Sequence, residues 1–241
     1  TIVMVKKDDA FKSILKNISS STSSASEEFK LVTSQDGLSM KPVTLGQQKE
    51  LLSNTLVEQP NRLDTNIQLT KLLLENAKAP EKIYALDRDF ILLQYRRSIA
   101  GKDLVLYTDD TPYTIDLDKH LEECTAKIAE REYDSEFTVT KDTITLTCGV
   151  PKLSRDYEVT THSQDQYRNM QAEMEESEAT KKAVEIAYLA ELVKYVEKVK
   201  IGEDEIDFLT GDVSLDQQLQ LLNALPYTLT SELSRKVSEI V

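Results

Sequence analysis

The sequence predicts an α+β fold, with a helical N-terminal unit, a central β-hairpin region and a helical C-terminal tail. Three observations support this prediction. Hydrophobic residues recur at helical spacing on both sides of a central stretch, and that stretch instead alternates hydrophobic and polar residues. Turn signals separate these patterns and divide the 241 residues into four segments. We expect an N-terminal arm over 1–40, a helical unit over 41–101, a hairpin-rich region over 102–162 and C-terminal helices over 163–241.

The arm contains the serine-rich run SSSTSS between two segments that can fold. This run has no large side chain to bury, which is typical of a flexible linker. Such a linker becomes ordered when a partner clamps it, so we expect it to lie at a protein interface. The predicted interface residues here are Ser19, Ser20, Ser21, Thr22, Ser23 and Ser24. After the run, hydrophobic segments over 29–32 and 38–43 flank the turn signal at 35–37 and predict a hairpin.

Three helices are expected in the segment over 41–101. In KPVTLGQQKELL, Thr44 is the predicted N-cap and Gln47 completes a capping box. The second helix starts near Arg62 and ends before the proline at 80. The predicted core-facing residues are Leu45, Leu52 and Leu56 in the first helix, and Leu63, Ile67, Leu69, Leu72, Leu73 and Leu74 in the second.

The third helix of this unit is LDRDFILLQYRRSIAG. Asp87 is its predicted cap and Gly101 its stop signal. The acidic residues over 87–89 fit a helix start, where negative side chains meet the positive end of the helix dipole. Its predicted core-facing residues are Phe90, Leu92, Leu93 and Ile99.

Two hairpins are predicted in the central region. DLVLYTDDTPYTIDL turns over 108–112 and places Leu106 near Tyr113, and EFTVTKDTITL turns over 141–142. A helical pattern over 118–131 lies between them, and residues 155–161 favour one more strand.

The tail is expected to be helical over 163–200, with a polar first half. The predicted apolar face of its second half consists of Val184, Ala187, Tyr188, Leu192 and Tyr195. Two short helices follow, one capped by Ser214 and one capped near Thr228.

Composition argues against several classes of partner. Acidic residues outnumber basic ones by 42 to 29, and the net charge of −13 disfavours binding to nucleic acid. No apolar run approaches the roughly 20 residues of a membrane span, so we expect no membrane partner. The two cysteines indicate reduced thiols rather than a disulfide framework.

Catalytic patterns are not evident in the sequence. The chain has two histidines, neither in a nucleophile signature, and six scattered glycines that form no phosphate-binding loop. We therefore predict no enzyme, no catalytic residue and no cofactor. The less favoured alternative is an enzyme whose site uses carboxylates or one of the histidines.

One metal hypothesis uses all of the soft ligands. His120 and Cys124 are four residues apart, so on a helix both lie on one face. Together with Cys148 and His162 they make a Cys2His2 set, the type that binds zinc. The wide spacing of the second pair leaves open whether the four meet, and no C-x-x-C motif supports the site.

The order of motifs from Lys41 to the C-terminus resembles that of baseplate hub proteins of contractile-tailed bacteriophages. The motifs are KPVTLGQQKELL, LDRDFILLQYRRSIAG, YTIDLDKHL, TLTCGVPKLSRD and LLNALPYTLTSELSRKV. Relatives of this kind often have a C-x-x-C pair in the hairpin where this chain has residues 108–111, TDDT. Without those thiolates the resemblance implies no zinc site, and we predict no metal.

The resemblance implies a viral structural protein that acts through protein contacts. It would belong to the virion as part of the tail baseplate, after assembly in the host cytoplasm, and would contact other phage baseplate and tail proteins in a large symmetric assembly. The alternative is a transient chaperone of hub assembly that leaves before the particle is finished. Arg96 and Arg97 are further predicted interface residues, although positive charge also suits a helix C-terminus.

Overall fold

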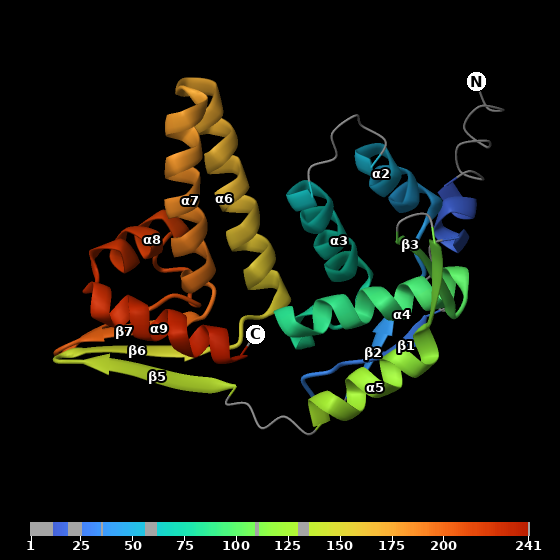
Figure 1. Ribbon diagram of the computed structural model, residues 1–241, viewed down its shortest axis with the longest axis horizontal. Helices are drawn as coiled ribbons and strands as arrows, with labels where there is room; N and C mark the ends of the chain where they lie inside the picture. The colour runs from blue at the N-terminus through green and yellow to red at the C-terminus, as the bar shows by residue number, and fades with distance from the viewer. Residues whose placement is uncertain are drawn as a thin grey trace.

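The computed structural model describes residues 12–18, 26–34, 36–55, 62–108, 111–129 and 135–240, and it confirms the α+β class. Figure 1 shows two lobes side by side. The first contains β1 (Glu27–Lys30), β2 (Gly37–Met40), α2 (Leu45–Thr55), α3 (Arg62–Asn76), α4 (Arg88–Ala100), β3 (Asp103–Thr108), β4 (Thr111–Asp116) and α5 (Leu117–Ala129). The second contains β5 (Glu136–Lys141), β6 (Ile144–Gly149), α6 (Leu153–Glu173), α7 (Glu176–Val193), β7 (Val196–Ile201), β8 (Asp204–Asp207), α8 (Leu215–Ala224) and α9 (Tyr227–Ile240).

The first core forms where the β1–β2 hairpin packs against α3 and α4. Phe29 lies opposite Leu38 in the hairpin, and its ring meets that of Tyr95 edge to face with 4.8 Å between centroids. The hydroxyl of Tyr95 donates to the carbonyl of Lys41 at 2.6 Å. The buried residues of this core are Phe29, Leu31, Leu38, Met40, Leu73, Ala77, Ile83, Ile91, Tyr95 and Leu153. The hairpin predicted in the arm thus shares one core with the helical unit.

Asp87 has a different role from the predicted cap of α4. Its side chain is fully buried and makes no capping hydrogen bond to that helix. It accepts hydrogen bonds instead from the backbone N–H groups of Val32, Thr33 and Tyr84 at 2.8, 2.9 and 2.9 Å, and from the Thr33 hydroxyl at 2.9 Å. The carboxylate therefore fastens the β1–β2 turn to the start of α4.

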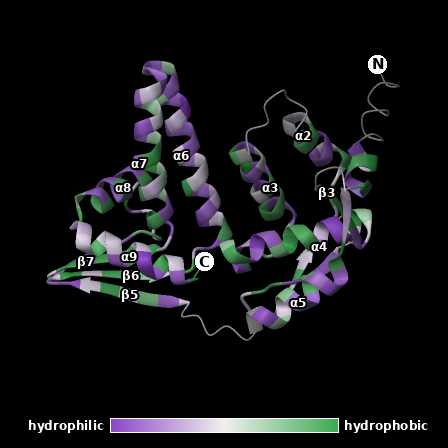
Figure 2. Cartoon of the chain, in the orientation of Figure 1, coloured by the Kyte–Doolittle hydropathy of each residue, from purple (hydrophilic) through white to green (hydrophobic). Residues whose placement is uncertain are grey.

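The second core lies on one face of a four-stranded antiparallel sheet of order β5-β6-β7-β8. Helices cover this face, with α9 running along the sheet in Figure 1. Its buried residues include Val139, Leu146, Cys148, Val159, Leu192, Val193, Val196, Val199, Phe208, Leu222, Leu229 and Leu233. Figure 2 shows the contrast between these hydrophobic strands and the hydrophilic residues that are frequent along α6 and α7.

The two lobes are joined where the chain before α4 meets the chain before α6. Tyr84 and Lys152 form an isolated antiparallel bridge, and the Lys152 Nζ lies 3.5 Å from the centroid of the Tyr84 ring. The N–H of Ala85 donates to the carbonyl of Pro151, and the N–H of Leu153 donates to the carbonyl of Ile83, both at 2.9 Å. Leu153 belongs to α6 but is buried in the first core.

The strand predicted over 155–161 was wrong, because this segment is the start of α6. Its β-branched residues favour a strand. A helix, however, directs Leu153 into the first core and Val159 into the second, and both side chains are fully buried. Burial on two sides thus outweighs local propensity. The helix also runs through the predicted segment boundary between residues 162 and 163.

The prediction that the chain is helical throughout 163–200 was also wrong. The chain turns at Met174 and Glu175 between α6 and α7, and residues 196–201 form β7. Val196 and Val199 are three residues apart, which mimics a helical spacing. In the sheet, Val196 pairs with Cys148 and Lys198 with Thr147, so the register shifts around residue 197 and both valines reach the core.

Several predicted core-facing side chains prove to be exposed. They are Leu45, Leu52, Leu63, Ile99, Val184, Ala187 and Tyr188, whereas Leu72, Leu73, Phe90, Leu192 and Tyr195 are buried. Leu56 lies outside the described residues. The exposed leucines of α2 belong to a helix whose main packing partner is α3.

Several predicted local signals are confirmed, but the cap predicted near Thr228 was wrong, because α9 already begins at Tyr227. Thr44 and Gln47 exchange capping-box hydrogen bonds at 3.0 and 3.2 Å, and Ser214 caps α8 in the same way. Gly101 ends α4 with a φ of 80°, and Leu106 lies opposite Tyr113. Among the described helices, none is long and apolar enough to span a membrane.

Burial raises the pKa of the Cys148 thiol from 9.0 to about 12. The unfolded chain loses this proton first, so we expect the free energy of unfolding to fall as the pH rises from 9 towards 12. Urea denaturation at pH 7, 9, 10 and 11 measures the decline. Cys148→Ala should make this decline with pH shallower. The decline that remains comes from Tyr95 and Tyr195, because burial raises the pKa of each tyrosine from 10.0 to about 12. An unchanged slope in this variant would contradict the assignment.

Candidate protein-interaction site

The hairpin β3–β4 carries a group of four exposed large apolar side chains. Val105, Leu106, Tyr107 and Tyr113 are all exposed, with Tyr107 at 74% and Tyr113 at 63%. Because side chains alternate along a strand, Leu106 and Tyr113 lie on one face, and Val105 and Tyr107 on the other. The hairpin therefore presents apolar surface on both faces.

Both edges of this hairpin are open among the described strands. β3 and β4 form a sheet of their own, at the opposite end of the molecule from the four-stranded sheet in Figure 1. In the large sheet, a backbone carbonyl of one outer strand, β5, is paired, since Lys236 on α9 donates to the carbonyl of Thr138 at 2.8 Å. Open strand edges beside exposed apolar residues are features that a protein partner normally covers.

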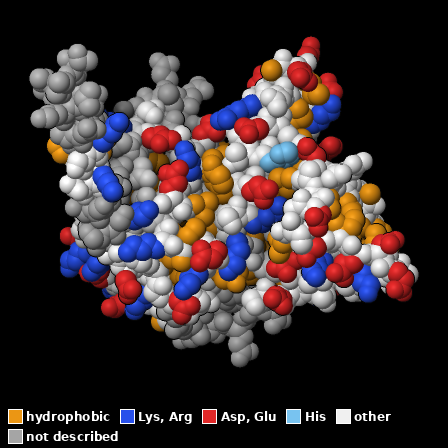
Figure 3. All heavy atoms as spheres, turned by 180° about the vertical axis from the view of Figure 1, so that it is seen from behind, with side chains coloured by type: hydrophobic (Ala, Val, Ile, Leu, Met, Phe, Trp, Pro, Cys, Tyr) orange, Lys and Arg blue, Asp and Glu red, His pale blue; other side chains and the backbone are white. Residues whose placement is uncertain are grey.

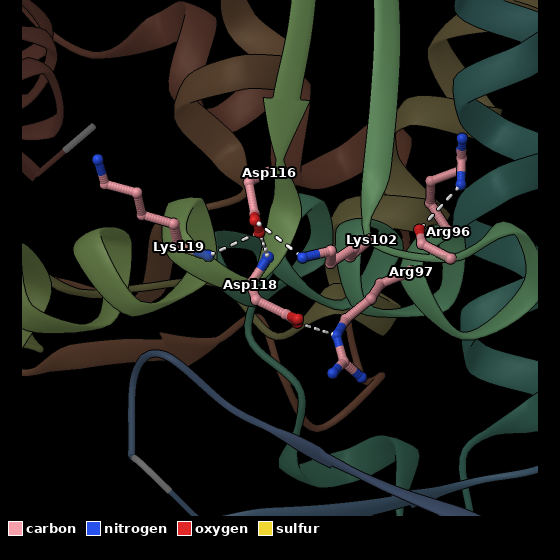
Figure 4. Close-up of polar contacts among 7 residues, drawn as sticks. Arg96, Arg97, Lys102, Asp116, Asp118 and Lys119 are labelled. Atoms are coloured by element: carbon pink, nitrogen blue, oxygen red, sulfur yellow. Dashed lines mark hydrogen bonds and ion pairs between the residues drawn. The ribbon is translucent and has the colours of Figure 1, made fainter.

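A polar junction fixes the base of the hairpin to α4 and α5, as Figure 4 shows. The Arg97 Nε donates to the carboxylate of Asp118 on α5. Arg96 donates to the carbonyls of Gly101 and Asp103 at 3.3 and 3.2 Å. Both predicted interface arginines thus have partners within the chain, and they orient the hairpin.

Asp116 completes the junction on the other strand of the hairpin. Its carboxylate accepts hydrogen bonds from the N–H groups of Asp118 and Lys119 at 3.0 and 3.3 Å, and it lies 3.4 Å from the Lys102 Nζ. The hydrogen bond from Lys119 and the charge of Lys102 lower the pKa of Asp116. The hydrogen bond and charge of Asp118 raise the pKa of Arg97. The junction is therefore charged on both sides at neutral pH.

The remaining predicted residues do not meet at this hairpin. The serine run over 19–24 lies outside the described residues. His120 and Cys124 lie together on α5, whereas Cys148 is buried in β6 and His162 on α6 contacts Asp216 at 2.8 Å. Within the described ranges, no three His, Cys, Asp or Glu side chains are grouped in a way that suits a metal ion.

Sequence reasoning missed two polar residues that line a cavity of about 570 Å³ between the end of β6, the start of α6 and the loop before α8. Arg155 is buried and donates to Glu158 at 3.2 Å and to Gln218, while its buried Nε has no partner in the described structure. Burial, together with the charges of Glu136 and Asp207, raises the pKa of Glu197. Only the fold reveals that Arg155 is buried and Glu197 half-buried, because single charged residues in charged stretches give no sequence signal.

The distribution of surface charge indicates no docking region as clearly as the exposed apolar residues of the β3–β4 hairpin do. Figure 3 shows one face of the molecule, on which acidic and basic side chains are interspersed around a band of hydrophobic ones. The concentration of exposed apolar residues on β3 and β4 is therefore the clearest signal of a protein contact.

Comparisons with protein-family models, with curated proteins and with solved structures each return no match. The hairpin and its junction therefore supply the structural support for a function.

Proposed function

We propose that this chain is a non-enzymatic structural subunit of the baseplate hub in the tail of a contractile-tailed bacteriophage. The order of sequence motifs from Lys41 onwards supports the class of assembly. The observation that supports a contact role is the β3–β4 hairpin, whose apolar side chains are exposed on both faces above an ion-paired base.

In this proposal a neighbouring baseplate or tail protein covers the hairpin. Burial of Tyr107 and Tyr113 against that protein supplies most of the binding free energy, since buried aromatic residues dominate protein interfaces. The open edges of β3 and β4 add main-chain hydrogen bonds if the partner contributes a strand. The contacts of Arg97 with Asp118 and of Lys102 with Asp116 hold the hairpin in the bound orientation.

The test replaces the two exposed tyrosines in a phage that carries this chain. Tyr107→Ser with Tyr113→Ser should leave folding intact, because both side chains are exposed, and should deplete the chain from purified particles. Quantitative mass spectrometry of particles and isolated baseplates measures its copy number. The matched control is Tyr227→Ser on α9, where the side chain is 80% exposed, and it should be retained at the normal copy number.

The same measurement can overturn the proposal in two ways. Normal copy number of the double variant would exclude the hairpin as the essential contact. A wild-type chain that is present in assembling lysates but missing from finished particles would replace the structural role with that of an assembly chaperone.

A further inference from the structure

The exposed side of α5 holds two metal-ligating side chains next to each other. His120 and Cys124 are one helical turn apart, and the Cys124 Sγ lies 3.7 Å from the His120 Nε2. The His120 side chain is exposed and that of Cys124 is half-buried, so both are accessible to an ion in solution. The buried Cys148 has no such access, since it lies in the second core.

The separation of these two atoms matches the geometry of zinc. Zinc binds thiolate sulfur at about 2.3 Å and imidazole nitrogen at about 2.0 Å in a tetrahedron, which places the two ligand atoms about 3.6 Å apart. The 3.7 Å between Sγ and Nε2 is already close to this value. One ion can thus bridge both side chains without a change in the backbone of α5.

The surroundings carry both signs of charge and leave the site half complete. Glu122 and Glu123 precede Cys124 on the helix, Lys119 is 3.8 Å from the Glu123 carboxylate, and Asp118 is paired with Arg97 of α4. No third ligand joins the pair within the described parts of the chain. Zinc in closed sites takes four protein ligands, so two more must come from outside this chain.

We propose that His120 and Cys124 form half of a tetrahedral site for zinc or a similar thiophilic divalent ion, and that a second copy of this chain supplies the other half. Two copies related by a two-fold axis bring the same pair twice and complete a Cys2His2 set. The ion then links the α5 helices of the two copies. This inference goes beyond the proposed function and does not depend on it.

The test is a titration of the full chain with Co²⁺ under reducing conditions, followed by sedimentation with and without Zn²⁺. Tetrahedral cobalt–thiolate complexes have visible absorption and a near-ultraviolet charge-transfer band. We expect both to appear, with an end point at one ion for two chains, and we expect Zn²⁺ to double the sedimenting mass. Cys124→Ser and His120→Ala should each abolish the bands and the mass change.

A matched control uses the other histidine. His162→Ala removes an imidazole that contacts Asp216 on α8 and should leave the metal response intact. Circular dichroism of each variant verifies that it is folded. The proposal is overturned if no thiolate band appears, if the band persists in Cys124→Ser, or if one ion binds to each monomer.

Discussion

Replacing Asp87 by alanine is expected to lower the free energy of unfolding by about 3 kcal/mol. The carboxylate is fully buried and accepts four hydrogen bonds, three of them from backbone N–H groups of Val32, Thr33 and Tyr84. Its removal leaves these donors without a partner in a region with little access to water, and each such donor costs about 1 kcal/mol or more. Urea denaturation followed by circular dichroism measures the loss.

Asp89 provides the matched control for this variant. It lies two residues further on, its side chain is 83% exposed, and it contacts Arg88 at 2.7 Å. Exposed ion pairs contribute little, so Asp89→Ala should cost less than about 1 kcal/mol. Equal losses in the two variants would show that Asp87 does not fasten the β1–β2 turn to the start of α4. Asp87→Asn keeps one acceptor oxygen and should give an intermediate loss.

Leu153→Ala is expected to cost about 3 kcal/mol, within the usual range for a fully buried leucine. The side chain is fully buried in the first core although it belongs to the first turn of α6. The cavity that it leaves would therefore weaken the first lobe through a residue of the second. Thermal and urea unfolding, each followed by circular dichroism, give the change.

The control for this loss is Leu209→Ala, at a leucine that is 59% exposed in the second lobe. Surface truncations of this kind usually change stability by less than about 0.5 kcal/mol. Hydrogen exchange adds a second readout: in Leu153→Ala, amides of α4 and β1 should exchange faster than in the wild type. Loss of protection confined to α6 would contradict the joining role of Leu153.

The elements that sequence could predict are those specified by neighbouring residues. The capping boxes at Thr44 and Ser214 and the register of Leu106 with Tyr113 each depend on residues a few positions apart. Strand β7 could not be predicted, because the register shift beside Glu197 gives Val196 and Val199 a helical spacing. The start of α6 was hidden because its residues are buried in two different cores.

The candidate site likewise has parts that the sequence could predict and parts that it could not. The β3–β4 hairpin was visible in the alternation of DLVLYT and its turn signal. The partners of Arg96 and Arg97 were not, because Asp103 and Asp118 come close only after the hairpin folds back onto α4. The role of Asp87 was likewise hidden, since its main partners at 32 and 33 are more than fifty residues away in sequence.

The position of Leu153 also has a consequence for synthesis on the ribosome. The first core contains residues from Phe29 to Tyr95 and is completed by Leu153, which is translated 58 residues after Tyr95. Domains usually fold as units, N-terminal first, while the chain is being made. Here the N-terminal lobe lacks part of its core, and the bridge partner of Tyr84, until the start of α6 has left the ribosome. The N-terminal lobe can therefore complete its core only after the start of the second lobe has emerged.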